Sequence, residues 1–238
     1  MQFKLKILTL VSLILCSSSS QGIDREILES KKCSGMFSYF EKRHNLPKDI
    51  LHSISLQESR KPHSKHKIGV VWPWTINVEG KGYHFKTKKE AIKFVKEEMR
   101  DGKTSIDIGC MQINLKHHPD AFTSLDQAFS PIKNIAYAAQ LLRNHYTRLG
   151  CWNKAIGEYH SKTGDRAKNY QDSVIKINNK MMSYKQDLKR YSSISNFRDR
   201  LYSSNIYDNV RSLYENRGRA EIQISRMKSK NLFRKYDQ

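Results

Sequence analysis

Apolar residues recur at helical spacing in separate segments of this 238-residue chain, and this pattern favours a mostly α-helical fold. The segments are residues 24–44, 50–58, 87–99, 131–150 and 152–160. Thr87 and Glu90 have the spacing of a capping box, which predicts a helix start at that point. Pro131 is expected to open the next long helix, and Gly150 to end it.

The stretch from Lys61 to Phe85 interrupts this periodicity. It contains two prolines and three glycines, so we predict a loop with a short hairpin. Before it, Pro47 is expected at the start of the helix that runs to Glu58.

The N-terminal segment has the pattern of a secretory signal. Lys4 and Lys6 precede an apolar run of about ten residues, which is too short to span a bilayer as a helix, and small residues follow it. We therefore predict that residues 1–22 are a signal peptide and that the protein is periplasmic or secreted. The alternative is an uncleaved N-terminal anchor. A multi-span membrane protein is excluded, since the sequence holds one apolar stretch.

Export would leave three cysteines, Cys33, Cys110 and Cys151. An oxidising compartment permits one disulfide among them and one remaining thiol. The residues alone leave all three pairings open.

The charge of the chain points to an anionic partner or environment. Lys and Arg number 43 against 23 Asp and Glu, a formal net charge of +20. Nucleic acid, an anionic membrane and cell wall all fit such a charge. Residues 183–238 hold 13 Lys and Arg against 6 Asp and Glu, so we predict a basic C-terminal extension, helical or partly disordered, after a folded domain at 24–182.

One carboxyl group stands out as a candidate acid. Glu58 closes an apolar helix, and a loop with Trp72 and Trp74 follows it. A carboxyl beside apolar groups has a raised pKa, so it can hold a proton near neutral pH and deliver it to a leaving oxygen. The plain alternative is a solvated charge at a helix end.

Two further segments carry polar groups suited to a sugar ligand. In the run 107–114, Gly109 permits close backbone approach, and Gln112 and Asn114 offer hydrogen-bond donors and acceptors. Tyr159 has a hydroxyl that can reach a neighbouring carboxyl. Taken singly, the two segments are better explained by structural roles: a buried strand or helix for the first, and a tyrosine packed at the edge of the core for the second.

Together these residues resemble a known family. Glu58-Ser59, the run Gly109-x-Met111-Gln112-Ile113-Asn114 and Tyr159 follow the order and spacing of the goose-type-lysozyme-like lytic transglycosylases, the SLT-domain enzymes, over residues 30–182. The insertion Trp72-Pro73-Trp74-Thr75-Ile76-Asn77 is similar to one bacterial subgroup of them.

The resemblance implies a lysozyme-like helical lobe with a substrate groove. It implies cleavage of the MurNAc-β-1,4-GlcNAc bond in peptidoglycan with formation of 1,6-anhydro-MurNAc ends. Glu58 would be the sole catalytic acid and base. The usual two-carboxylate scheme needs a second acid. Asp101 and Asp107 are candidates for it, but neither lies in a matched catalytic motif.

The resemblance also assigns roles around Glu58. Ser59 would position Glu58 and the sugar, and Tyr159 would hydrogen-bond near Glu58. The groove-lining residues would be Met111, Gln112 and Asn114. Trp72 and Trp74 are candidates for stacking on sugar faces, or for anchoring their loop to the core.

The sequence departs from the broad family at Cys110 and in the run Glu158-Tyr159-His160-Ser161, where the family commonly has Ala-Tyr-Asn-Ala-Gly. Cys110 stands where Leu is commoner, and a cysteine pattern in the subgroup implies a Cys33–Cys110 disulfide with Cys151 left free. His160 stands where the family commonly has Asn, so the role of that Asn is not carried over.

No cofactor is expected. His63, His66, His117 and His118 lack the carboxylate or cysteine partners of a recognisable zinc motif, so no metal is expected either. The expected partner is the peptidoglycan glycan strand, with a secretion or conjugation apparatus as a candidate assembly and at most peripheral contact with an anionic membrane. Nucleic acid is disfavoured by the signal peptide and by the lack of a binding motif. A lysozyme-type hydrolase and a non-catalytic wall-binding scaffold are the alternatives.

Overall fold

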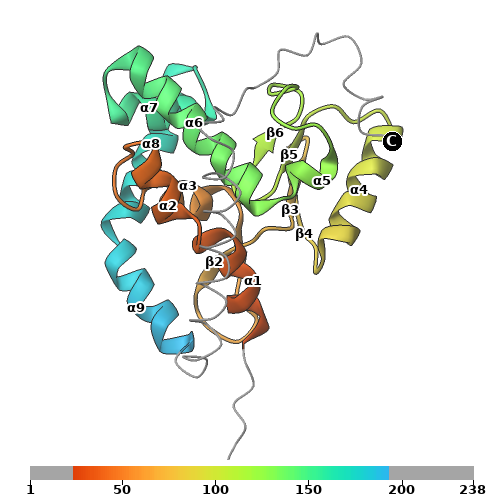
Figure 1. Ribbon diagram of the computed structural model, residues 1–238, viewed down its shortest axis with the longest axis horizontal. Helices are drawn as coiled ribbons and strands as arrows, with labels where there is room; N and C mark the ends of the chain where they lie inside the picture. The colour runs from red at the N-terminus through yellow and green to blue at the C-terminus, as the bar shows by residue number, and fades with distance from the viewer. Residues whose placement is uncertain (1–23, 193–238) are drawn as a thin grey trace, which may run out of the picture.

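The computed structural model describes residues 24–192 (Figure 1); the predicted signal peptide and residues 193–238 of the predicted extension lie outside this range. The described part is mostly helical, as predicted. The helices are α1 (Arg25–Ser34), α2 (Phe37–Arg43), α3 (Ile50–Glu58), α4 (Lys88–Arg100), α5 (Leu125–Ala128), α6 (Pro131–Leu149), α7 (Trp152–His160), α8 (Gly164–Asn179) and α9 (Met181–Ser192). The strands are β1 (Arg60–Pro62), β2 (Gly69–Val71), β3 (Thr75–Val78), β4 (Lys81–His84), β5 (Ile106–Ile108) and β6 (Ile113–Asn114).

Helix α3 lies at the centre of the fold. It contacts α2, α8 and the β1–β2 hairpin, and α7 packs between α6 and α8. In Figure 1, α7 and α8 lie on one side of α3, and the larger sheet with α4 lies on the other. The end of α3 therefore reaches the place where the helices meet the sheet.

The larger sheet is antiparallel, with strand order β4-β3-β5-β6. Ile76, Ile108 and Ile113 are cross-strand neighbours that all face the core, as expected for a sheet with one buried face. On the other face, Asn77, Asp107 and Asn114 are cross-strand neighbours and only partly buried. The sheet thus presents a polar row centred on one carboxylate.

The segment predicted as a loop with a short hairpin is more regular than that. It contains the β1–β2 hairpin and also β3 and β4, which pair with each other. The prolines and glycines of the turns could be read from the sequence. However, β3 also pairs with β5, about 30 residues further on, and turn residues give no information about a pairing at that distance.

Most predicted helix ends are confirmed. Thr87 and Glu90 form the full capping box of α4, and Pro131 opens α6. Gly150 ends α6 in the left-handed conformation, at φ 64°.

The prediction for Pro47 was wrong, because α3 begins at Ile50. Asp49 adopts a left-handed φ of 65°, which interrupts the helix before that point. The buried carboxylate of Glu41 accepts hydrogen bonds from the backbone N–H groups of Asp49, at 3.1 Å, and Leu51, at 2.9 Å. A side chain from α2 thus satisfies donors at the start of α3.

Helix α9 continues past the predicted domain boundary at residue 182. Tyr184 donates a hydrogen bond to the Gly69 carbonyl at 3.0 Å, its ring meets that of His52 edge to face, and Lys185 pairs with Asp49. The first residues of the predicted extension therefore pack on the domain. Within residues 24–192, no helix has the length and apolar character needed to cross a membrane.

Candidate active site

Glu58, the last residue of α3, is partly buried and held by one strong hydrogen bond. The Tyr170 hydroxyl on α8 donates to its Oε1 at 2.5 Å. Burial raises the pKa of Glu58 to about 7; the negative charge of Asp107 acts in the same direction, and the Tyr170 hydrogen bond opposes it. Glu58 can therefore hold and release a proton near neutral pH.

Tyr170 contacts the candidate acid, and the sequence did not reveal it. Tyr159 was expected to hydrogen-bond near Glu58, but its hydroxyl donates to the Met111 carbonyl at 2.8 Å, and Tyr170 reaches the carboxyl instead. Burial and the charge of Glu58 raise the pKa of both phenols well above the usual value, so both remain donors. The spacing of Tyr170, Val174 and Ile177 marks an inward helix face, but nothing local links it to a residue 112 positions earlier.

A tight turn brings the run 109–114 to the end of α3. Gly109 has φ +83°, and a Cβ there would lie 2.8 Å from Nδ2 of Asn134. Asn134, buried on α6, accepts from the Met111 N–H at 2.9 Å and donates to the carbonyls of Ile108 and Ala128. Asn134 was also missed, because its partners are distant in the sequence.

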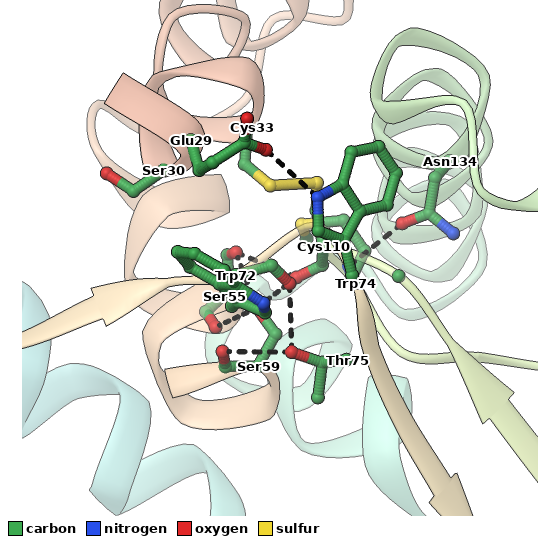
Figure 2. Close-up of a disulfide and its surroundings, with 12 residues drawn as sticks. Glu29, Ser30, Cys33, Ser55, Ser59, Trp72, Trp74, Thr75, Cys110 and Asn134 are labelled. Carbon is green, nitrogen blue, oxygen red and sulfur yellow. Dashed lines mark hydrogen bonds between the residues drawn. A yellow bond between two sulfur atoms is a disulfide. The ribbon is translucent and has the colours of Figure 1, made fainter. Parts of the chain in front are cut away.

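The turn is fixed to α3 and α1 as well (Figure 2). The hydroxyls of Ser55 and Ser59 donate to the Cys110 carbonyl at 2.7 and 2.8 Å. A disulfide joins Cys110 to Cys33 on α1, with Cα atoms 5.9 Å apart, and Cys151 is free. The pairing implied by the resemblance is thus confirmed. Ser59 has no exposed surface, so its side chain does not contact a sugar in this structure, and its role in positioning Glu58 stays a prediction.

The predicted groove-lining residues fall into two groups. Met111 is fully buried. Gln112 and Asn114 are partly exposed and held: Gln112 donates to the Thr75 carbonyl at 3.1 Å, and Asn114 donates to Oδ1 of Asp107 at 2.9 Å. Burial raises the pKa of Asp107, and the Asn114 hydrogen bond opposes that shift. The structure thus places a second carboxylate, Asp107, within electrostatic reach of Glu58.

Residues 35–181 match the family model of the transglycosylase SLT domain. The chain belongs to this family. Membership supports a lysozyme-like fold and indicates lytic-transglycosylase-type cleavage of peptidoglycan. A comparison with curated proteins finds no match, and a comparison with solved structures finds none either.

Within this SLT domain, both tryptophans of the insertion are buried. Trp72 is 4% exposed and Trp74 is 6% exposed. Their indole N–H groups donate to the Phe85 carbonyl at 2.7 Å and to Glu29 on α1 at 2.9 Å (Figure 2 shows the second). The structure therefore favours the alternative in which they anchor their loop to the core.

The structure also brings together Asp24, His63 and His66, a set whose ligand atoms lie within 4.8 Å of one another. Nδ1 of His63 accepts from the backbone N–H groups of Lys65 and His66, at 3.0 and 3.2 Å. A neutral His63 therefore carries its proton on Nε2, which faces Oδ2 of Asp24 at 3.1 Å. A metal ion would need the lone pair of that nitrogen, so this geometry suits a polar cluster better than a metal site.

The other two histidines of the sequence analysis lie apart from this cluster. His117 is exposed, and Nδ1 of His118 lies 3.0 Å from the Tyr137 hydroxyl. The expectation that no metal binds stays a prediction.

Proposed function

We propose that this SLT domain is an exported lytic transglycosylase that cleaves the MurNAc-β-1,4-GlcNAc bond and leaves 1,6-anhydro-MurNAc ends. The observation that carries the proposal is the partly buried Glu58 carboxyl, whose pKa is raised to about 7 and whose Oε1 is held by Tyr170. A single group with such a pKa can act first as an acid and then as a base. The cysteine pair and the basic charge fit an oxidising compartment and an anionic wall.

The reaction needs only this one group. Protonated Glu58 gives its proton to the glycosidic oxygen, which leaves as the 4-hydroxyl of the GlcNAc residue. The ionised carboxylate then takes the proton of the muramoyl 6-hydroxyl, whose oxygen bonds to C1 and closes the anhydro ring. No water is consumed. Because Tyr170 donates to the carboxyl, it stabilises the carboxylate formed between the two steps.

A lysozyme-type hydrolase is the second candidate, and Asp107 favours it. Glycosidases of the usual kind use two carboxyl groups that flank the scissile bond. Asp107 lies on β5, is held by Asn114, and its charge acts on Glu58. Under this alternative, Asp107 would activate water or stabilise the positive charge at C1.

Digestion of purified peptidoglycan separates the two reactions by product mass. Anhydro ends support the transglycosylase, while reducing ends heavier by one water support the hydrolase.

Asp107→Asn should leave most of a transglycosylase's rate and remove most of a hydrolase's rate. Glu58→Gln should abolish cleavage under either, while binding to isolated wall persists. A Glu58→Gln protein with wild-type cleavage would exclude the assigned role.

The same assignment sets the pH profile. Glu58 must be protonated for the first step, so the rate should fall as the pH rises through about 7. Initial rates on soluble glycan strands at constant ionic strength test this. A rate that rises steadily from pH 6 to pH 9 would contradict the assignment.

A further inference from the structure

His160, the last residue of α7, lies in contact with the tyrosine that holds Glu58. Its side chain is exposed, and its ring stacks on the ring of Tyr170 with centroids 4.7 Å apart and planes within 4° of parallel. Tyr170 itself is buried and reaches Oε1 of Glu58. Contacts thus run from the surface of the domain to the carboxyl through a single intervening side chain.

The packing of α7 on α8 determines this stack. A Cβ at Gly157 would lie 2.8 Å from the Ala167 carbonyl oxygen, so the two helices approach as closely as they do because position 157 has no side chain. On the other side, the Tyr159 hydroxyl fixes α7 to the Met111 carbonyl. The end of α7 is therefore held between α8 and the turn, with His160 facing Tyr170.

We propose that His160 is a positioning residue, whose stacked ring keeps the Tyr170 hydroxyl on Oε1 of Glu58 and leaves the second carboxyl oxygen to the glycosidic bond. The inference rests on the proposed function, since it concerns the orientation of the same carboxyl. A tyrosine ring with one free face can tilt about its side-chain torsions, and a parallel ring on that face restricts the tilt. A residue that departs from the common family pattern thereby acquires a role in this chain.

The groups around Glu58 make this role measurable. Tyr170 faces it from α8, Tyr159 from α7 and Asp107 from β5, and the charges of His117 and His160 act on Asp107. Among these, the Tyr170 hydrogen bond favours the ionised carboxylate, whereas burial and Asp107 favour the neutral acid. Loss or misplacement of the Tyr170 hydroxyl must therefore raise the pKa of Glu58.

The experiment compares His160→Ala, His160→Phe and Tyr170→Phe in the full chain. The Glu58 carboxyl is titrated by carbon-13 NMR, its signal assigned by difference from Glu58→Gln, and the pH profile of cleavage is recorded in parallel. Tyr170→Phe and His160→Ala should both raise the pKa of Glu58 by about one pH unit. His160→Phe keeps a flat ring on Tyr170 and should leave the wild-type value. The double variant His160→Ala/Tyr170→Phe should shift no further than Tyr170→Phe alone.

A matched control comes from the other end of α7, where Trp152 stacks on Tyr146 with centroids 3.9 Å apart. Trp152→Ala removes a ring stack from the same helix and should leave the pKa of Glu58 unchanged. If His160→Ala fails to fold, His160→Asn replaces it with the same expected shift.

The proposal is overturned if His160→Ala leaves the Glu58 titration at the wild-type value, or if His160→Phe shifts it as much as His160→Ala does. Failure of the proposed function is distinguishable from both. It would appear as wild-type protein that cleaves no peptidoglycan, whatever the titration shows.

Discussion

At the scale of single residues, the space beside Gly109 has no room for a side chain. Asn134 fills it, and its amide is hydrogen-bonded to the Met111 N–H and the Ile108 carbonyl beside the turn and to the Ala128 carbonyl at the end of α5. Gly102, just after α4, has the same φ of +83° but nothing within 4 Å of a built Cβ. The two glycines therefore share a backbone requirement and differ only in packing.

Gly109→Ala should destabilise the domain more than Gly102→Ala does. Both changes carry the cost of a left-handed alanine, about 1 kcal/mol. Only the first also forces Asn134 aside, which adds about 1–3 kcal/mol. Urea denaturation of both variants measures the difference in the free energy of unfolding. Equal losses would show that Asn134 moves away at no cost.

Local pattern and long-range contact explain which site residues could be predicted. Glu58 was predictable because it closes an apolar helix and because the motifs around it resemble a family. Tyr170 and Asn134 were not, since their partners are 112 and 23 residues away and no spacing rule connects them. The burial of Trp72 and Trp74 could not be predicted either, because the local sequence does not distinguish a tryptophan that binds sugar from one that packs in the core.

At the scale of elements, the helices follow from their sequences better than the strands do. Caps such as Thr87 and Gly150 act within a few residues, so the sequence locates them. Strands β5 and β6 are two or three residues long and exist through pairing with β3 and with each other. Helix α1, in turn, is joined to the turn after β5 by the disulfide and to the β1–β2 hairpin by the Glu26–Lys61 ion pair.

Loss of the Cys33–Cys110 disulfide should lower the stability of the domain substantially. The bond closes a sequence separation of 77 residues, for which chain-entropy arguments give about 4 kcal/mol. The paired variant Cys33→Ala/Cys110→Ala should show this loss in urea denaturation. Cys151→Ser is the control and should unfold like the wild type. A paired variant as stable as the control would exclude a stabilising role for the bond.

Glu26 on α1 makes a pH-dependent contribution to the stability of the domain. Burial alone would raise its pKa, but the Lys61 ammonium and the Ser64 N–H outweigh burial and lower the pKa to about 2. The stabilisation should therefore be complete above about pH 4.5 and be lost as the pH falls towards 2.

Glu26→Gln should cost about 1 kcal/mol at pH 7 and only a small part of that at pH 2, where Glu26 is already half protonated in the folded protein. Denaturant titrations at the two pH values measure this. Glu97→Gln removes an exposed partner of Lys93 at 3.8 Å and serves as the control with little effect at either pH. An equal cost for Glu26→Gln at both pH values would rule out the charge as its origin.

At the scale of the whole molecule, the net charge of +20 is carried on a protein whose family substrate is an anionic wall. Surface charges attract over about 8 Å at physiological ionic strength. The charge is thus suited to concentrating the protein on the wall, while the chemistry proposed above is assigned to Glu58.

Binding to isolated wall should therefore weaken steeply with salt. Glu58→Gln protein, which should bind without cutting, is titrated onto wall fragments between 50 and 500 mM NaCl, a range that shortens the screening length roughly threefold. Cleavage of short glycan strands whose lactyl carboxyls have been amidated, and which therefore carry no charge, is the control for the wild type and should change little. Wall binding that is insensitive to salt would show that the net charge does not drive the attraction to the wall.

The path of α9 also determines where this domain can be divided. The family match ends at residue 181, but the helix runs to Ser192, and its Tyr184 and Lys185 are bonded to Gly69 and Asp49. A chimera spliced at residue 182 would therefore lose the hydrogen bond to the Gly69 carbonyl and the ring contact that covers His52. Exchange of this catalytic domain between proteins should carry the whole of α9, with the junction placed after residue 192.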